Sequence, residues 1–147
     1  MYKVIVVGTD GSDRAARATE AAFSLAELTG ATVHIVHVMR PVAMASAGYG
    51  DPSAIATANA DARANGDLIC ARLLADAERQ GLVAQVHNVD GDPADMLIKV
   101  AESVQADLVV IGNWGMTGVK RLVLGSVPNK VSHHCPCSIL IVDTDAA

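Results

Sequence analysis

Three glycines and a serine in the last third of the chain have the types and spacing of a phosphate-binding loop. Gly112 and Gly115, and then Gly125-Ser126, follow the apolar run at residues 107–111. Glycine permits positive φ and lets a ligand approach main-chain N–H groups without meeting a Cβ. A serine N-cap, which we expect at Ser126, and the unpaired N–H groups of the following helical turn favour an anion. The pattern therefore predicts that this loop binds a phosphate.

The spacing excludes two familiar phosphate-binding motifs. A Walker loop requires Gly-x4-Gly-Lys-Ser/Thr, and the chain contains no Gly-Lys pair. The dinucleotide fingerprint requires Gly-x-Gly-x-x-Gly after the first strand. Here the expected first strand, residues 4–7, is followed by Gly8-Thr9-Asp10-Gly11-Ser12. The motif present is instead Gly-x2-Gly-x9-Gly-Ser.

This motif, together with its position and the order of elements around it, resembles that of the universal stress protein family. The resemblance runs from Tyr2-Lys3-Val4-Ile5-Val6-Val7 to Cys137-Ser138-Ile139-Leu140-Ile141-Val142. It implies a cytoplasmic stress-response sensor or regulator that binds ATP, with or without Mg²⁺, and forms a homodimer. The glycine loop would hold ribose and phosphates, the turn after the first strand would lie beside adenine and ribose, and backbone groups at Val38 would read the adenine edge. The implied nucleotide-binding residues are Thr9, Asp10, Gly11, Ser12, Val38, Gly112, Asn113, Gly115, Gly125, Ser126 and Val127.

Several of these residues and their neighbours have a purely structural alternative. Asp10 either caps the loop before the first helix or binds a ribose hydroxyl or a metal. Lys120 and Arg121, inside the nine-residue spacer, either neutralise phosphates or are simply solvated. Trp114 either shields the nucleotide or packs at a dimer surface.

The sequence offers no set of catalytic residues. It contains no Gly-x-Ser-x-Gly elbow and no His-Glu-x-x-His, and nothing fixes Asp13 or Asp51 near Asp10. We therefore expect nucleotide binding, with slow ATP hydrolysis as the enzymatic alternative. A cyclic AMP-binding member of the same family is the other alternative, because Pro128 and Trp114 could shorten the phosphate pocket. An adaptor with an empty site is disfavoured, since every motif glycine is present.

The run His133-His134-Cys135-Pro136-Cys137 invites a zinc interpretation. One residue between the cysteines and two adjacent histidines argue against it, so we expect no metal site there. A helix C-terminus with a proline stop explains the run instead. With Cys70 on a helix stripe, the three cysteines indicate reduced thiols rather than a disulfide framework.

Composition predicts one globular domain spanning residues 1–147. Hydrophobic residues make up 51% of the chain and charged residues 18%, which suffices for a packed core. A net charge of -5, with no basic stretch interleaved with aromatics, disfavours nucleic-acid binding. No apolar run approaches the length of a membrane span, and a strand begins directly after Met1-Tyr2-Lys3, where a signal peptide would need room. We expect a cytoplasmic protein with no membrane partner.

The alternation of β-branched runs with longer Ala/Leu-rich segments predicts an α/β fold. It is a doubly wound, Rossmann-like sheet of five parallel strands. The expected strands are residues 4–7, 33–38, 83–89, 108–111 and 138–142. The first and fourth should be central and the third an edge. Ligands of such sheets bind where strand order reverses, here between the first and fourth strands, which would bring Asp10 and Gly112 together.

Cap signals place four helices between these strands. Ser12 and Gly30 should bound the first, and Gly81 should end the helix at residues 67–80. Asp92-Pro93 should open the third, and Ser126 should cap the fourth. Residues 41–66 should begin as a mobile loop and become helical from about residue 53. The apolar last strand, if it lies at a sheet edge, should pair with a second copy and form a homodimer.

Overall fold

The computed structural model describes residues 1–42, 51–113 and 124–145. Trp114, Gly115, Lys120 and Arg121, and the part of the expected mobile loop at residues 43–50, lie outside the described residues. In chain order the elements are β1 (Val4–Thr9), α1 (Asp13–Thr29), β2 (Thr32–Met39), α2 (Pro52–Arg79), β3 (Ala84–Asp90), α3 (Pro93–Ser103), β4 (Leu108–Gly112), α4 (Ser126–His134) and β5 (Ser138–Val142).

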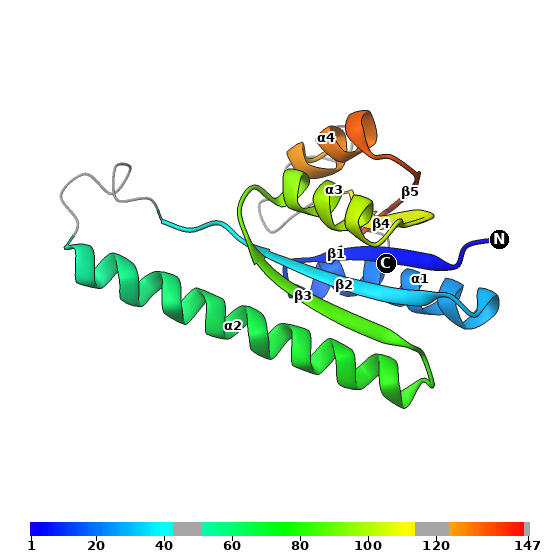
Figure 1. Ribbon diagram of the computed structural model, residues 1–147, viewed down its shortest axis with the longest axis horizontal. Coiled ribbons are helices and arrows are strands. Elements are labelled where there is room, and N and C mark those ends of the chain that lie inside the picture. The colour runs from blue at the N-terminus through cyan, green and yellow to red at the C-terminus, as the bar shows by residue number, and fades with distance from the viewer. Residues whose placement is uncertain (43–50, 114–123, 146–147) are drawn as a thin grey trace.

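The strands form one parallel sheet in the order β3-β2-β1-β4-β5 (Figure 1). The order reverses between β1 and β4, so the predicted doubly wound α/β sheet is confirmed. The predicted central position of the first and fourth strands and the edge position of the third are also confirmed. Within the described residues, β5 forms the opposite edge and pairs only with β4.

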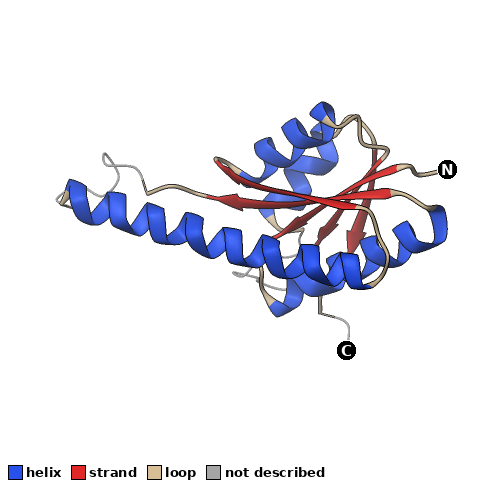
Figure 2. Ribbon diagram, turned by 60° about the horizontal axis from the view of Figure 1, so that its bottom comes forward, coloured by secondary structure: helices blue, strands red, loops and turns tan. Residues whose placement is uncertain are grey.

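Helices cover both faces of the sheet, with α1 and α2 on one side and α3 and α4 on the other (Figure 2). Ile5 and Val7 of β1 point into the cluster that α1 and α2 cover, whereas Val6 points into the opposite cluster. All three side chains are fully buried. Because both faces of β1 are buried, successive residues of the strand at 4–7 are all apolar. No helix among the described residues is long and apolar enough to cross a membrane.

The cap signals set both ends of α1 and the start of α3 as predicted. The Ser12 hydroxyl accepts a hydrogen bond from the N–H of Ala15 at 3.2 Å and begins α1. Gly30, at φ 71°, closes the same helix in the left-handed conformation that glycine tolerates best. Asp92 caps α3, and Pro93 stands in the first turn, where its missing N–H costs nothing.

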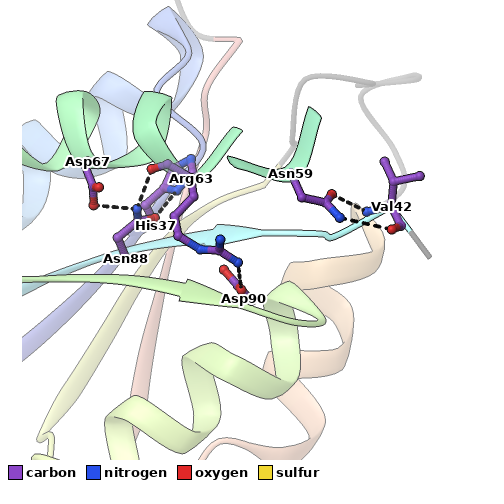
Figure 3. Close-up of polar contacts among 7 residues, drawn as sticks. All are labelled: His37, Val42, Asn59, Arg63, Asp67, Asn88 and Asp90. Atoms are coloured by element: carbon purple, nitrogen blue, oxygen red, sulfur yellow. Dashed lines mark hydrogen bonds and ion pairs between the residues drawn. The ribbon is translucent and has the colours of Figure 1, made fainter. Parts of the chain in front are cut away.

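Helix α2 begins at Pro52, close to the expected residue 53, and its N-terminal half extends beyond the sheet (Figures 1 and 2). Two hydrogen bonds join the helix to the segment after β2, because the amide of Asn59 pairs with the backbone N–H and C=O of Val42 (Figure 3). Arg63 forms an ion pair with Asp90 at the end of β3. Polar contacts therefore hold this part of α2.

Asn88 of β3 lies at the centre of the polar contacts between α2 and the sheet (Figure 3). Its amide nitrogen donates to the carbonyl oxygen of Arg63 at 2.9 Å and to Asp67 at 2.8 Å. Its oxygen lies 3.0 Å from Nδ1 of His37, which assigns the imidazole hydrogen to Nδ1. Gly66 leaves room for this arrangement, because a Cβ there would lie 2.4 Å from the Asn88 oxygen.

We predict that Gly66→Ala destabilises the protein. In an ordinary helix interior the change stabilises by about 1 kcal/mol. Here the added methyl group must displace the Asn88 amide, and we expect a net loss of about 1–3 kcal/mol, the usual cost of overpacking. Urea denaturation followed by circular dichroism measures the difference. Asn65→Ala, one residue away at an exposed position, is the matched control and should be neutral or slightly stabilising. A Gly66→Ala variant more stable than wild type would contradict the prediction.

Candidate functional site

The turn after β1 is folded by its own side chains. The Thr9 hydroxyl accepts a hydrogen bond from the N–H of Gly11 at 3.0 Å, and Oδ1 of Asp10 accepts one from the N–H of Ser12 at 2.9 Å. Asp10 therefore does cap the loop before α1. Within the described part of the chain, its second carboxylate oxygen accepts no hydrogen bond. The local role thus leaves that oxygen for a ligand.

Gly11 brings this turn against helix α2. Its φ is 79°, a conformation that residues with a side chain rarely adopt. A Cβ at this position would lie 2.5 Å from Cδ1 of Ile69, so glycine is needed for space as well as for backbone geometry. The turn at residues 9–12 is therefore positioned partly by α2, whose own position the Asn88 contacts fix.

Asn113 joins the ends of β4 and β5 to the start of α4. Its backbone N–H donates to the carbonyl of Val142 at 2.9 Å, and its carbonyl accepts from the N–H of Gly125 at 3.0 Å. Its side-chain oxygen accepts from the N–H and the hydroxyl of Thr144, at 2.9 and 2.8 Å. Its side-chain nitrogen donates to Asp143 at 3.3 Å. The sequence placed Asn113 in the loop motif but did not reveal this anchoring role.

The expected serine cap of α4 is wrong by one residue. Gly125 is the N-cap, and Ser126 is the first helical residue, with no side-chain cap hydrogen bond. The cause is the bond from the Gly125 N–H to Asn113, which fixes Gly125 in an extended conformation while its carbonyl accepts from Asn129 at 3.0 Å. Pro128 lies buried in the first turn, as expected. The exposed Ser126 hydroxyl is consequently not used to cap its own helix.

The remaining predicted residues lie near the C-terminal ends of the strands or outside the described residues. Gly112 ends β4 opposite Val142 of β5. Val38 lies near the end of β2, and Val127 follows the first helical residue of α4. Both valines are half-buried against the core cluster that α3 and α4 cover. Gly115 lies outside the described residues.

Asp92 carries an electrostatic contact that the sequence analysis missed. Its carboxylate lies 3.7 Å from Arg40, just after β2, and 3.4 Å from Nζ of Lys130 on α4. A backbone hydrogen bond from Asp95 and then the Lys130 ammonium hold the pKa of Asp92 below its ordinary value. Asp95 also pairs with Lys130 at 2.7 Å. The single lysine of α4 therefore forms ion pairs with two carboxylates. The sequence could not reveal these pairs, because they depend on how α3 and α4 pack together.

The described residues contain no cluster of three or more His, Cys, Asp or Glu side chains able to hold a metal ion. In the His-His-Cys-Pro-Cys run, the rings of His133 and His134 are 6.4 Å apart and inclined at 60°. The histidines form the last turn of α4, and Cys135 caps its C-terminus. The run therefore occupies the helix end that the sequence analysis proposed for it.

Comparison with known proteins relates the whole chain to one family. The model of the universal stress protein family matches residues 1–143. Universal stress protein YxiE of Bacillus subtilis is 31% identical over 147 residues, covering 97% of this chain and 99% of that protein. A universal stress protein of Mycobacterium tuberculosis is 33% identical over 150 residues, covering 97% of each chain. A crystal structure of a universal stress protein in complex with cAMP superimposes with a TM-score of 0.74 at 30% identity, covering 98% of each chain.

We predict that Asn113→Ala loosens the edge of the sheet where β4, β5 and α4 meet. The substitution leaves the N–H of Thr144, a residue only 6% exposed, without its acceptor. An unsatisfied buried donor costs about 1–3 kcal/mol, so stability should fall by that amount. Chemical denaturation measures the loss. Asn129→Ala, at an exposed position of α4, is the control and should cost far less. Equal losses of stability in the two variants would contradict the anchoring role of Asn113.

Proposed function

The chain belongs to the universal stress protein family, and from that membership we propose that it binds an adenine nucleotide where β1 and β4 end. The observation that carries the proposal is the meeting of three elements at the point where strand order reverses. These are the turn at residues 9–12, the end of β4 at Gly112, and the N-terminus of α4, which Gly125 caps. Doubly wound sheets bind their ligands at such points.

The phosphate group is assigned to the first turn of α4. The N–H groups of this turn are unpaired within the helix, and the helix dipole favours an anion there. The Ser126 hydroxyl is exposed and makes no cap hydrogen bond, so it can donate to a phosphate oxygen. Gly125 permits the close approach of Asn113 at this turn, because a Cβ there would lie 3.2 Å from the carbonyl oxygen of Asn113.

The ribose and the adenine are assigned to the ends of β1 and β2. Oδ2 of Asp10 accepts no hydrogen bond within the described part of the chain and suits a ribose hydroxyl. Val38 offers backbone groups near the end of β2, next to β1 in the sheet. Together with Thr9, Gly11, Ser12, Gly112, Asn113, Gly115 and Val127, these residues form the proposed binding set.

ATP is the first proposed ligand and cyclic AMP the second. The glycine spacing resembles the ATP-binding pattern of the family, which favours ATP, with or without Mg²⁺. A universal stress protein 30% identical to this chain was crystallised with cAMP, which keeps the smaller ligand in consideration. Pro128 lies in the first turn of α4, where a proline could shorten the phosphate pocket toward the smaller ligand.

We propose binding without efficient turnover, as suits a cytoplasmic stress-response regulator. Backbone N–H groups and Ser126 would stabilise phosphate charge equally in the ground state and the transition state, which gives affinity without acceleration. Oδ1 of Asp10 is engaged by Ser12, and no motif supplies a second acid or base. Hydrolysis, if it occurs, should be far slower than the typical enzyme rate of about 10 per second.

Calorimetric titration of Ser126→Ala tests the phosphate assignment. The variant loses one hydrogen bond to an ionised group, on the order of 1.5–3 kcal/mol, so ATP affinity should fall roughly tenfold to a hundredfold. Ser132→Ala is a matched control on the same helix. Ser132 lies near the C-terminal end of α4, and its hydroxyl donates to the backbone carbonyl of Asn129. Gly125→Val and Gly115→Val should abolish binding in folded protein.

The same titration decides between the ligands and between the function classes. ATP, AMP and cyclic AMP are each titrated with and without Mg²⁺. Tighter, Mg²⁺-independent binding of cyclic AMP would replace ATP as the ligand. Equal ATP affinity in Ser126→Ala, Ser132→Ala and the folded Gly125→Val variant would refute the phosphate assignment. Multiple rapid turnovers abolished by Asp10→Ala would identify an enzyme instead of a regulator.

A second part of the proposal is a homodimer through β5. This strand lies at the edge of the sheet and pairs only with β4 among the described residues, so one row of its backbone groups can pair with a second copy. Leu140, in the middle of β5, is 36% exposed. Val142 instead packs against the core cluster under α1, so a lysine there would test folding rather than association.

We predict that Leu140→Lys converts a dimer into monomers without unfolding the chain. Two lysines brought together across a twofold axis would repel each other, and the apolar contact would be lost. Sedimentation at micromolar concentration measures the association. Leu28→Lys, at a leucine of α1 that is 83% exposed, is the control and should leave the dimer intact. A wild-type chain that sediments as a monomer would refute the dimer.

A further inference from the structure

Cys135 and Cys137 bring two thiols together at the corner between α4 and β5. Their sulfur atoms are 3.6 Å apart, with Pro136 between the two residues, and both side chains are half-buried. The backbone N–H of Cys135 donates to the carbonyl of Val131 at 2.9 Å and so ends α4. Cys135 then turns into an extended conformation, at φ -67° and ψ 136°. Proline fixes the next φ, so the geometry that brings the sulfurs together is largely preset.

We propose that Cys135 and Cys137 form a reversible thiol–disulfide site that a hydroperoxide oxidises. In the first step, the Cys135 thiolate attacks one oxygen of hydrogen peroxide. The S–O bond forms as the O–O bond breaks, hydroxide leaves, and Cys135 becomes a sulfenic acid. In the second step, the sulfur of Cys137 attacks that of Cys135. The S–S bond forms, and the sulfenic oxygen leaves as water with the Cys137 proton. Both electrons that reduce the peroxide come from the thiol pair.

The surroundings of the two thiols assign their order of reaction. Burial first, and then the adjacent Cys135 and the charge of Asp107, raise the pKa of Cys137 to about 12. Burial and the nearby Asp107 carboxylate disfavour a thiolate at Cys137, so we assign the second step to Cys137 and the attack on peroxide to Cys135. Peroxide uptake should be slow, because Cys135 lies at the C-terminus of α4, where the helix dipole disfavours a thiolate.

The third cysteine has neither the exposure nor a neighbouring thiol. Cys70 is 3% exposed in α2, and burial raises the pKa of its thiol. Its sulfur lies 4.0 Å from the backbone oxygen of His87, on the α2 side of the sheet. The pair lies on the opposite side, against the cluster that α3 and α4 cover. Cys70 therefore serves as an internal control for the reactivity of the pair.

Once Cys135 is oxidised, the disulfide should close readily, and it should also be reduced readily. Bond formation requires the sulfurs to approach from 3.6 Å to about 2.05 Å, a shift within reach of side-chain rotation. The closed loop contains only Cys135, Pro136 and Cys137, so it restricts the unfolded chain very little and stabilises the fold little. A bond strained by so short a loop is easily reduced, which is typical of a regulatory rather than a structural disulfide.

Thiol mapping on the folded, fully reduced protein tests the proposal. Samples are exposed to graded hydrogen peroxide, freed of peroxide, and then unfolded in urea and alkylated with N-ethylmaleimide, so that the buried Cys70 also reacts. They are then digested with trypsin. Cleavage after Arg63, Arg72 and Lys130 places Cys70 and the pair in separate peptides. We expect the peptide of residues 131–147 to lose both alkylation sites and two hydrogen atoms, and dithiothreitol to restore them. The Cys70 peptide should remain fully alkylated.

The variants separate the two steps. Cys70→Ser should form the disulfide as wild type does, and Cys135→Ser and Cys137→Ser should not. Cys137→Ser should accumulate a sulfenic acid that dimedone labels at Cys135. Three alkylatable thiols in wild type, after an exposure that oxidises a synthetic peptide of residues 131–141, would overturn the proposal. So would oxidation of Cys70 before the pair, or disulfides that join two chains on a non-reducing gel.

Discussion

Burial of β1 on both faces is the constraint on which the rest of the structure depends. Ile5, Val6 and Val7 are fully buried, and burying each such side chain contributes about 1.5–3 kcal/mol. A strand without an exposed face requires helices on both sides, and parallel neighbours then require crossover connections. Polar groups are consequently displaced to the strand ends. The middle of the sheet is apolar and buried, so polar residues that could bind a ligand lie at the C-terminal ends of the strands.

Two asparagines hold different elements together at the C-terminal ends of the strands. Asn88 fastens α2 to β2 and β3, and α2 in turn contacts the turn at Gly11 through Ile69. Asn113 fastens β4 to β5 and to the start of α4. Each amide offers a donor group and an acceptor, so one side chain can satisfy several partners at once. The proposed nucleotide site lies between these two anchors, one for each half of the sheet.

The elements predicted from sequence were those set by local signals. The sequence predicts the strands, and which strands are central, from runs of buried residues. It predicts the caps at Ser12, Gly30 and Asp92 from neighbours within one helical turn. The sequence predicts the cap of α4 at Ser126, because serine is a preferred capping residue. Gly125 takes that position instead through its bond to Asn113, a contact across the loop that no local rule reveals.

The candidate site was predictable only in outline for the same reason. The order of strands brought the turn at residues 9–12 and Gly112 to one edge, as topology alone requires. The engagement of Lys130 by Asp92 and Asp95 depends on which helix faces which, and the charge pattern gave no sign of it. Gly66 is a similar case, because a glycine inside a helical segment could equally have been a weak point as a space for Asn88.

Helix α4 carries one proposed site at each end, and its packing argues that the two act independently. The helix has nine residues, so its ends are about 13 Å apart. Between them Val131 is fully buried and Pro128 is buried, which fixes the helix against the core. The proposed disulfide would move sulfur atoms that lie after the last helical turn, and rotation of the cysteine side chains would take up that movement. Coupling between sites requires an element with two arrangements that both ligands bias, and burial of Pro128 and Val131 opposes a second arrangement of this helix.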